Sequence, residues 1–404
     1  MDFPKPSESN ILSLVEDIRQ AAVKDTTSTT GSPDTHFHLL SLIDQLRLAV
    51  EAPTETVLRL IYQPSQNAAL RTLIDLGVFK LLVSHGTSSL LAEELSTYTK
   101  AEKGLIVRLM RVATALGLCD NPEHEVYKPN TKTGIMTHPI GRDGVQCIYD
   151  LTMPTLSKLP SYFAEHNYTL PIDYNASPMH WAIGQSQFEW LASNHHQQGL
   201  FNSYMASRRE GRPAWFDVYP VERLTQIDCA SGSDSGPNSY SCSCSAAHGK
   251  EEGVFLVDIG GNQGHDLLKF RERFPDAPGR LVLQDLPTVI EGVDSRSGPG
   301  SECALDKNRV EAMGYSFFDP QPVKGARIYY FHSIFHDWPD SICLTIFRNT
   351  VSAMNPLHSR IIIVDFVLPD TETPLLQASL DIQMMSIGSG VERSRASGRS
   401  SWGK

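Results

Sequence analysis

The stretch VFLVDIGGNQGHDLLKFRERFP, residues 254–275, decides the fold of this chain. It begins with an apolar run of the kind that forms a buried strand, and this run leads into a glycine-rich turn. The following segment, HDLLKFRERFP, has apolar residues spaced three or four apart, which predicts an amphipathic helix. A buried strand, a turn and a helix in this order predict a βαβ unit in a parallel sheet.

The residues that follow repeat this alternation. Apolar runs at 280–287 (RLVLQDLP), 315–318 (YSFF), 326–335 (ARIYYFHSIF) and 360–370 (RIIIVDFVLPD) predict further strands, and DSICLTIFRNTVSAMN at 340–355 predicts a helix between the last two. Strands that alternate with helices predict an α/β domain with a Rossmann-like sheet covered by helices.

Polar signals at two consecutive strand ends predict an adenosyl cofactor. Ligands of such sheets bind beyond the carboxyl ends of the strands. The turn after the first strand does not fit Gly-x-Gly-x-x-Gly, because Asn262 stands where the second glycine belongs, so we expect no pyrophosphate there. Asp285 ends the next strand, where a carboxylate can accept both ribose hydroxyls. Each signal alone also fits a plain loop, but together they favour S-adenosylmethionine over NAD.

The stretch FHSIFHDWPD, residues 331–340, places a histidine at the tip of an apolar strand. His336 is either part of an ordinary polar loop or a general base above a pocket. Imidazole suits the second role because one nitrogen can accept a proton while a carboxylate holds the other.

Composition limits the other function classes. The chain has 404 residues and a formal charge of −11, which disfavours nucleic acid and anionic membranes as partners. The N-terminus lacks a basic segment followed by an apolar one, and the seven cysteines are scattered, so we expect a cytoplasmic protein with reduced thiols. The pair CSC at 242–244 with His248 lacks a second cysteine pair at zinc spacing, so we expect no metal site.

Changes in composition divide the chain into six regions. Residues 24–36 are small and polar, and we expect a disordered N-terminus over 1–36. Helices followed by a hairpin predict a winged-helix-like domain over 37–135, whose second helix (102–118) is too apolar for DNA recognition and fits a core or a dimer interface. The remaining regions are a helical, aromatic-rich connector and substrate-pocket region (136–228), a Ser/Gly-rich insertion (229–253), the α/β domain (254–392) and an atypical tail (393–404).

The chain resembles a known enzyme family. The segments at 204–222 (YMASRREGRPAWFDVYPVE), 256–267 (LVDIGGNQGHDL), 281–292 (LVLQDLPTVIEG), 317–340 (FFDPQPVKGARIYYFHSIFHDWPD) and 366–394 (FVLPDTETPLLQASLDIQMMSIGSGVERS) are similar to the fungal secondary-metabolism O-methyltransferases, relatives of the plant caffeate-type enzymes. The region 37–130 resembles the dimerisation domain of that family, which implies a homodimer.

The resemblance implies a role for each matching residue. His336 corresponds to the catalytic base of the family, and Asp365 and Glu392 correspond to the acids that hold it. The implied cofactor contacts are Gly260 and Gly261 at the methionine part, Asp285 at the ribose, Ser316 and Phe317 near the adenine, and His332 at a place that usually holds Arg or Lys.

The expected activity is therefore transfer of a methyl group from S-adenosylmethionine to a phenolic or enolic hydroxyl of a small aromatic, polyketide-like metabolite, without a metal. The alternative is a silent or repurposed member of the same fold, similar to a pericyclase. A DNA-binding regulator is a third possibility, which the acidic charge opposes.

The last residues depart from the family pattern. Family members continue past the Glu-Arg-Ser motif with a helix and two further strands. Here the sequence after Val391 has Trp402 as its single large apolar residue, which predicts no buried strand. We therefore expect the last strands of the sheet to be missing and the strand RIIIVDFVL (360–368) to lie at an edge.

Overall fold

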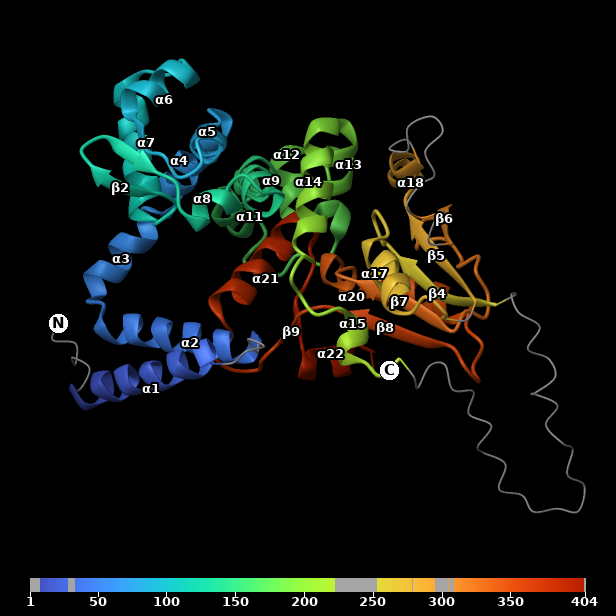
Figure 1. Cartoon of the computed structure of the whole chain (residues 1–404). Coiled ribbons are helices and arrows are strands. Elements are labelled where there is room, and N and C mark those ends of the chain that lie inside the picture. Colours follow the sequence, from blue (N-terminus) through green and yellow to red (C-terminus); the bar gives the residue numbers. More distant parts are fainter. Residues whose placement is uncertain are drawn as a thin grey trace, which may run out of the picture.

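The structure is a computed structural model, and it describes residues 8–27, 33–221, 253–277, 279–294, 305 and 309–402. Figure 1 shows the N-terminal helices on one side, a layer of helices in the middle and the main sheet on the other side. The Ser/Gly-rich insertion expected at 229–253 lies outside the described residues except for Gly253.

The N-terminal part is mainly helical. Its elements are α1 (Glu8–Thr27), α2 (Pro33–Val50), α3 (Pro53–Ile61), α4 (Gln63–Asp75), α5 (Val78–Ser84), β1 (Leu90–Leu91), α6 (Ala92–Thr99), α7 (Lys103–Ala115), β2 (Asp120–Glu123), β3 (Val126–Lys128) and α8 (Thr131–Ile135).

The expectation of a disordered N-terminus over 1–36 is wrong for much of that range. Residues 8–27 form α1, which packs along α2, and α2 begins at Pro33 rather than at residue 37. The physical reason is the apolar spacing in NILSLVEDIRQAAV, which gives one side of the helix a surface to bury. Ala21 and Leu42 are the buried residues of the pair.

The helices and hairpin expected between 37 and 135 are present. The helices α6 and α7 precede the antiparallel strands β2 and β3, and β1 pairs with the other side of β3. The apolar face of α7 is buried at Ile106, Val107 and Met110, as expected for a helix that packs in a core. The assignment of a winged helix stays a prediction.

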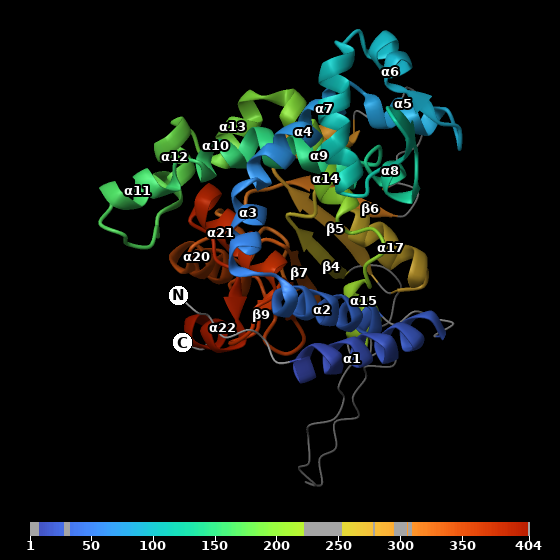
Figure 2. The same cartoon turned by 90° about the vertical axis from the view of Figure 1, so that its left-hand side faces the viewer.

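The middle region is helical, as its apolar pattern predicts. It consists of α9 (Pro139–Cys147), the short π-helix η1 (Ile148–Thr152), α10 (Met153–Leu156), α11 (Leu159–Glu165), the short 3-10 helix η2 (Tyr174–Ala176), α12 (Pro178–Ile183), α13 (Gln187–Ser193), α14 (His195–Ser207) and α15 (Trp215–Val218). Figure 2 shows α9 to α14 above the labelled strands β4 and β5, whereas α15 lies lower in the view.

The C-terminal part is the α/β domain. Its elements are β4 (Val254–Ile259), α17 (His265–Arg273), β5 (Arg280–Asp285), α18 (Pro287–Asp294), β6 (Val310–Gly314), β7 (Ile328–His332), η4 (Phe335–Asp337), α20 (Asp340–Val351), β8 (Arg360–Val364), β9 (Val367–Leu368), α21 (Leu375–Gly388), β10 (Arg393–Ser394) and α22 (Arg395–Trp402).

The main sheet is parallel, with the strand order β6-β5-β4-β7-β8. Its strands are apolar on both faces because helices cover both. Leu256, Leu283 and Tyr330 belong to one core cluster, and Val257, Val282 and Tyr329 belong to another. Such continuous apolar strands are typical of parallel sheets in α/β domains. None of the helices described above combines the length and apolar character needed to cross a bilayer.

Two expectations about strands need correction. The run YSFF is not a strand, because β6 ends at Gly314 and the chain turns after it. The tail, for which no buried strand was expected, contains a two-residue strand, since Arg393 and Ser394 form β10 beside β9, and α22 follows. Within the described residues β8 pairs with β7 on one side only, so the strand expected at the sheet edge does lie there.

The register of the sheet brings the predicted site residues to one edge. The direction of strand succession reverses at β4, because the chain continues from β4 toward β6 on one side and returns to β7 on the other. In open α/β sheets such a reversal point forms the ligand crevice. Asp258 is level with Tyr330, and His332 is level with Val364, so the loops after β4, β5, β7 and β8 leave the sheet together.

Candidate active site

The turn after β4 packs so closely against its neighbours that Gly260 and Gly261 have no room for side chains. Gly260 has a left-handed backbone with φ of 77°, and a Cβ on it would lie 2.4 Å from Ile334 Cδ1. A Cβ on Gly261 would lie 2.6 Å from the Asp258 carboxyl group. Both glycines are therefore required by close packing, and their backbones form a tight cradle at the strand end.

Asp285 is built into this cradle. Its Oδ2 accepts a hydrogen bond from the Asn262 backbone N–H at 2.7 Å, and its Oδ1 accepts one from the Leu286 N–H at 2.7 Å. Burial raises the pKa of the Asp285 carboxyl, and the two N–H groups offset part of this effect. Each carboxylate oxygen keeps a second acceptor site for a ligand.

Two buried polar atoms near the cradle have no hydrogen-bond partner among the described residues. They are Asp258 Oδ2 and Asn262 Oδ1. Burial, together with the neighbouring Asp266 carboxylate, raises the pKa of Asp258 well above its usual value. Buried polar groups are normally hydrogen-bonded, so these atoms fit a site that receives a polar ligand.

His332 is held by protein groups at the edge of the same site. Its Nδ1 donates to Asp266 Oδ2 at 2.7 Å, and the same oxygen accepts from Tyr330 Oη at 3.0 Å and from Arg209 Nη1 at 3.2 Å. Burial alone would raise the pKa of Asp266, but these partners outweigh it and lower the pKa. His332 thus has one nitrogen engaged, and its Nε2 stays available to a ligand.

Ser316 and Phe317 follow β6 at the same edge. The Phe317 ring packs against Trp338 at a centroid distance of 5.9 Å, and its carbonyl accepts from Asn349 Nδ2 at 3.0 Å. Ser316 Oγ accepts the Phe318 N–H at 3.4 Å. Phe317 is therefore partly a core residue, which a sequence pattern does not reveal.

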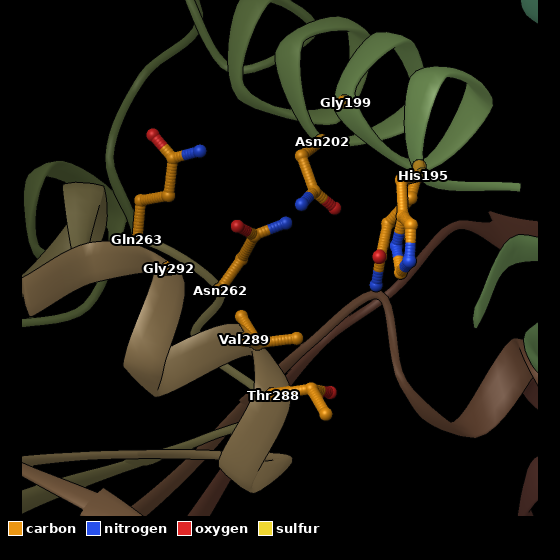
Figure 3. Close-up of a pocket in the computed structure, with 9 residues that line it drawn as sticks. His195, Gly199, Asn202, Asn262, Gln263, Thr288, Val289 and Gly292 are labelled. Carbon is orange, nitrogen blue, oxygen red and sulfur yellow. The ribbon is translucent and has the colours of Figure 1, made fainter. Parts of the chain in front are cut away.

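A cavity of about 170 Å³ opens beside the cradle, between α14 and the start of α18 (Figure 3). Its polar side chains come from both parts of the chain. Figure 3 shows the carboxamides of Asn202 and Asn262 facing each other across the space, with His195 further along α14. The complete lining is His195, Gln198, Gly199, Asn202, Asn262, Gln263, Thr288, Val289 and Gly292. None of the α14 residues was predicted, because their place depends on how the connector packs.

His336 lies in η4, directly after the strand β7, and is 6% exposed. Its Nδ1 donates to Glu392 Oε1 at 2.6 Å, and the Glu392 side chain is fully buried. A short contact between a charged acceptor and a ring N–H is among the stronger hydrogen bonds in proteins. The predicted pairing of His336 with Glu392 is thus present as a direct contact.

Asp365 is close enough for its charge to act on His336, but unlike Glu392 it makes no direct hydrogen bond to the imidazole in the described structure. Its Oδ1 has no hydrogen-bond partner among the described residues, and burial raises the pKa of Asp365 to about 7 although the His336 charge opposes this. Asp337, which was not predicted as a site residue, has its Oδ1 at 3.6 Å from His336 Nε2. Its position directly after the histidine was the only sequence signal for it.

The carboxylates set the protonation of the imidazole. Burial by itself lowers the pKa of His336, but the Asp337 charge, the hydrogen bond to Glu392 and the Asp365 charge together raise it to about 9. His336 is therefore a stronger base than a free imidazole, whose pKa is about 6.5.

The segment 388–393 packs against the turn that carries His336. Val391 N–H donates to the His336 carbonyl at 2.9 Å, and Glu392 N–H donates to Asp381 Oδ1 at 2.9 Å. A Cβ on Gly390 would lie 2.2 Å from the His336 carbonyl oxygen. The segment 388–393 therefore packs directly on the turn that carries the histidine.

The described residues contain no group of three or more His, Cys, Asp or Glu side chains that could hold a metal ion. The segment with Cys242, Cys244 and His248 lies outside the described residues. The described site thus combines the glycine cradle, the Asp285 carboxylate and the buried His336–Glu392 pair at one sheet edge. These features suit a group transfer in which the protein aligns two reactants and removes a proton.

Comparisons with known proteins agree with this architecture. Residues 251–400 match the O-methyltransferase domain family, and residues 58–134 match the O-methyltransferase dimerisation domain family. The demethylsterigmatocystin 6-O-methyltransferase of Aspergillus parasiticus is 31% identical over 356 residues, which cover 88% of this chain and 83% of that protein. Methyltransferase cfoC of Aspergillus candidus is 29% identical over 394 residues, which cover 96% of this chain and 90% of that protein.

Two solved structures illustrate that other proteins have the same fold. A structure described as a pericyclic reaction enzyme has a TM-score of 0.79 and 27% identity, and covers 98% of this chain and 93% of that one. OxaC in complex with sinefungin and meleagrin has a TM-score of 0.78 and 26% identity with the same coverage. This chain belongs to the O-methyltransferase family and is an S-adenosylmethionine-dependent enzyme of that family.

Proposed function

We propose that the chain methylates a phenolic or enolic hydroxyl of an aromatic, polyketide-like metabolite, with His336 as the general base. The observation that carries this proposal is the buried His336–Glu392 pair, with its 2.6 Å contact, at the same sheet edge as the glycine cradle. The substrate class is supported by the names of relatives such as demethylsterigmatocystin 6-O-methyltransferase.

S-adenosylmethionine supplies an electrophilic methyl group when it is bound. In this proposal Gly260 and Gly261 accommodate its methionine part, and Asp285 accepts the ribose hydroxyls. Ser316 and Phe317 stand on the adenine side, and His332 Nε2 is a further polar contact. The free acceptor sites of Asp285 and the unpartnered Asn262 Oδ1 favour a polar ligand in this cradle.

His336 removes the proton of the substrate hydroxyl. A phenol has a pKa near 10, so transfer to an imidazole of pKa 6.5 costs roughly 5 kcal/mol. With the pKa of His336 at about 9, the gap is about one unit and the cost falls to roughly 1.4 kcal/mol. Glu392 holds Nδ1–H and leaves Nε2 as the proton acceptor, on the side where Asp337 stands.

The direct test uses S-adenosylmethionine with a labelled methyl group and a panel of polyphenols and polyketide-type enols. We expect the label to appear in an ether of the acceptor, with formation of demethylated cofactor. Binding of the cofactor without label transfer to any acceptor in the panel would contradict the proposal.

A second candidate function is a rearrangement without methyl transfer. It is favoured by the likeness to the pericyclic reaction enzyme and to LepI, whose structure with S-adenosylmethionine has a TM-score of 0.78. The two functions differ in one readout, because an isomerisation converts the substrate without consuming the cofactor. The buried hydrogen-bonded pair of His336 and Glu392 favours methyl transfer, because it supplies a general base.

We also propose a homodimer formed through the N-terminal helices. Apolar side chains on α1, α2 and α3 are exposed, including Leu12 at 61%, Phe37 at 66% and Ile61 at 57%. A large exposed apolar surface marks an interaction site, and the matched dimerisation domain begins on α3.

A reducing compartment such as the cytosol fits the three described cysteines, 119, 147 and 343, which are buried and free.

A further inference from the structure

Arg393 is a buried cation whose contacts surround the turn that carries His336. The residue is 7% exposed. Its Nη1 donates to the Phe335 carbonyl at 2.8 Å, and its Nη2 donates to the Trp338 carbonyl at 3.0 Å. These two carbonyls flank the segment His336–Asp337, so the guanidinium holds the turn at both of its ends.

The same side chain pairs with the Asp340 carboxylate. Arg393 Nε and Nη2 both donate to Asp340 Oδ1, at 3.0 and 2.6 Å, and Nη2 also lies 3.3 Å from Cys343 Sγ. Asp340 is the first residue of α20 and is half exposed. The guanidinium thus connects the turn to the start of the next helix.

Arg393 is also the chain neighbour of Glu392, which binds His336 from the other side. Its backbone belongs to the segment 388–393, whose Val391 N–H donates to the His336 carbonyl. One residue therefore ties together the turn that carries the base and the segment that carries its carboxylate. The distance between His336 Nδ1 and Glu392 Oε1 depends on the positions of that turn and that segment, because His336 lies on the first and Glu392 on the second.

The chemistry of the site requires arginine for this connection. A buried guanidinium is costly unless its donors are paired, and here they are directed to three carbonyls, of Phe335, Trp338 and Val391, and to the Asp340 carboxylate. A lysine ammonium is a compact charge that cannot reach acceptors on opposite sides of a turn in one fixed plane.

We propose that Arg393 is a positioning residue for the methyl-transfer reaction, which sets the His336–Glu392 contact by locking the turn 335–338 to the segment 388–393. This inference rests on the proposed function, in which His336 is the base. Arg393 itself does not touch the reacting atoms in this proposal.

The charged groups around His336 determine what the loss of Arg393 does to it. The carboxylates of Asp337, Glu392 and Asp365 act on the imidazole. The positive charge of Arg208 lowers the pKa of Asp337 and so favours its charged form. When the turn loosens, the hydrogen bond from His336 Nδ1 to Glu392 lengthens. The imidazolium then loses part of its stabilisation, so the pKa of His336 falls.

The test compares Arg393→Lys with the wild-type chain by three measurements. Calorimetry gives the affinity for S-adenosylhomocysteine, steady-state kinetics give kcat against pH, and NMR of histidine-labelled protein gives the titration of His336, with His336→Asn used to assign the signal. We expect a cofactor affinity within about twofold, a kcat lower by roughly 10- to 100-fold, and a His336 titration moved to lower pH.

Arg71→Lys is the matched control. Arg71 is 17% exposed and makes a two-pronged pair with Asp150 in the helical region, away from the His336 turn. This control should leave the His336 titration and kcat unchanged. If it moves them as much as Arg393→Lys does, the effect is a general one of losing a buried arginine and the proposal is wrong.

Should Arg393→Lys fail to fold, Asp340→Asn takes its place, because Asp340 is half exposed and its amide keeps the shape of the contact. A smaller shift of the His336 titration in the same direction is expected. An unchanged titration in the folded variant overturns the proposal. The NMR readout needs no turnover, so it tests Arg393 even if the wild-type chain transfers no methyl group, a result that would instead reject the proposed function.

Discussion

Replacing Glu392 with Gln tests whether the carboxylate makes His336 a strong base. The change removes a charge and keeps the size of the side chain, so the amide can still accept from His336 Nδ1. The wild-type hydrogen bond is 2.6 Å long, and the Glu392 side chain is fully buried. The variant therefore isolates the electrostatic contribution at an almost unchanged geometry.

The size of the effect follows from the contacts of the imidazole. The carboxylates raise the pKa of His336 from 6.5 to about 9, which corresponds to roughly 3 kcal/mol of net stabilisation of the imidazolium. A hydrogen bond to a charged group is worth about 1 kcal/mol more than one to a neutral group. Loss of the Glu392 charge should therefore lower the pKa of His336 by roughly one unit, because Asp337 and Asp365 remain.

The assay is the pH dependence of kcat/KM, which reports the base in the free enzyme. His336 must be neutral to accept a proton, so the wild-type rate rises with pH through about 9. In Glu392→Gln the pH at which kcat/KM rises should move about one pH unit lower. The plateau of kcat/KM at high pH should fall by up to about tenfold, because the pKa of the base is lower by that unit. At acidic pH the two rates should approach each other, since more of the variant imidazole is neutral.

This explanation is wrong if the kcat/KM of the wild-type chain rises with a midpoint near pH 6.5, which is the pKa of an unperturbed imidazole. It also fails if Glu392→Gln lowers the rate equally at every pH without moving that midpoint. That second result would make Glu392 a packing residue.

Two further predictions concern the cradle and the segment that packs on the base. Asp285→Ala should weaken the binding of S-adenosylhomocysteine by about 1.5–3 kcal/mol, and calorimetry that gives equal affinities for variant and wild type would exclude the ribose role. Gly390→Ala should destabilise the fold by about 1–3 kcal/mol in denaturant unfolding, because its Cβ would lie 2.2 Å from the His336 carbonyl oxygen. Gly398→Ala is the control: it lies inside α22 with open space around it, so it should be neutral or stabilising by up to about 1 kcal/mol.

Local sequence patterns sufficed where the structure depends on strand and helix periodicity. The glycine turn after β4, Asp285 after β5 and His336 after β7 converge because parallel strands of one sheet end at one edge. The sequence thus predicted the neighbourhood of these residues without any side-chain geometry. The helices α6 and α7 and the hairpin after them were predictable because local apolar spacing and turn residues define them.

Long-range packing decides the features that the sequence did not predict. Which carboxylate reaches His336 Nδ1 depends on how residues 388–393 fold over the turn, so Asp365 and Glu392 could not be told apart in advance. The role of Arg393 depends on the same contact, and the place of α14 beside the cradle depends on how the connector packs. The helix α1 was missed because the small polar residues at 24–36 outweighed its apolar spacing.

The central claim is that His336 removes the proton of the substrate hydroxyl. The most direct measurement is the turnover of His336→Ala, with a phenolic substrate identified from the label-transfer panel, together with its affinity for S-adenosylhomocysteine. We expect turnover to fall by about 10²- to 10⁴-fold, while the cofactor affinity hardly changes and turnover partly recovers as the pH approaches about 10, where a phenol ionises in water. Turnover that survives the alanine substitution would contradict the claim and leave His336 as a structural part of its turn.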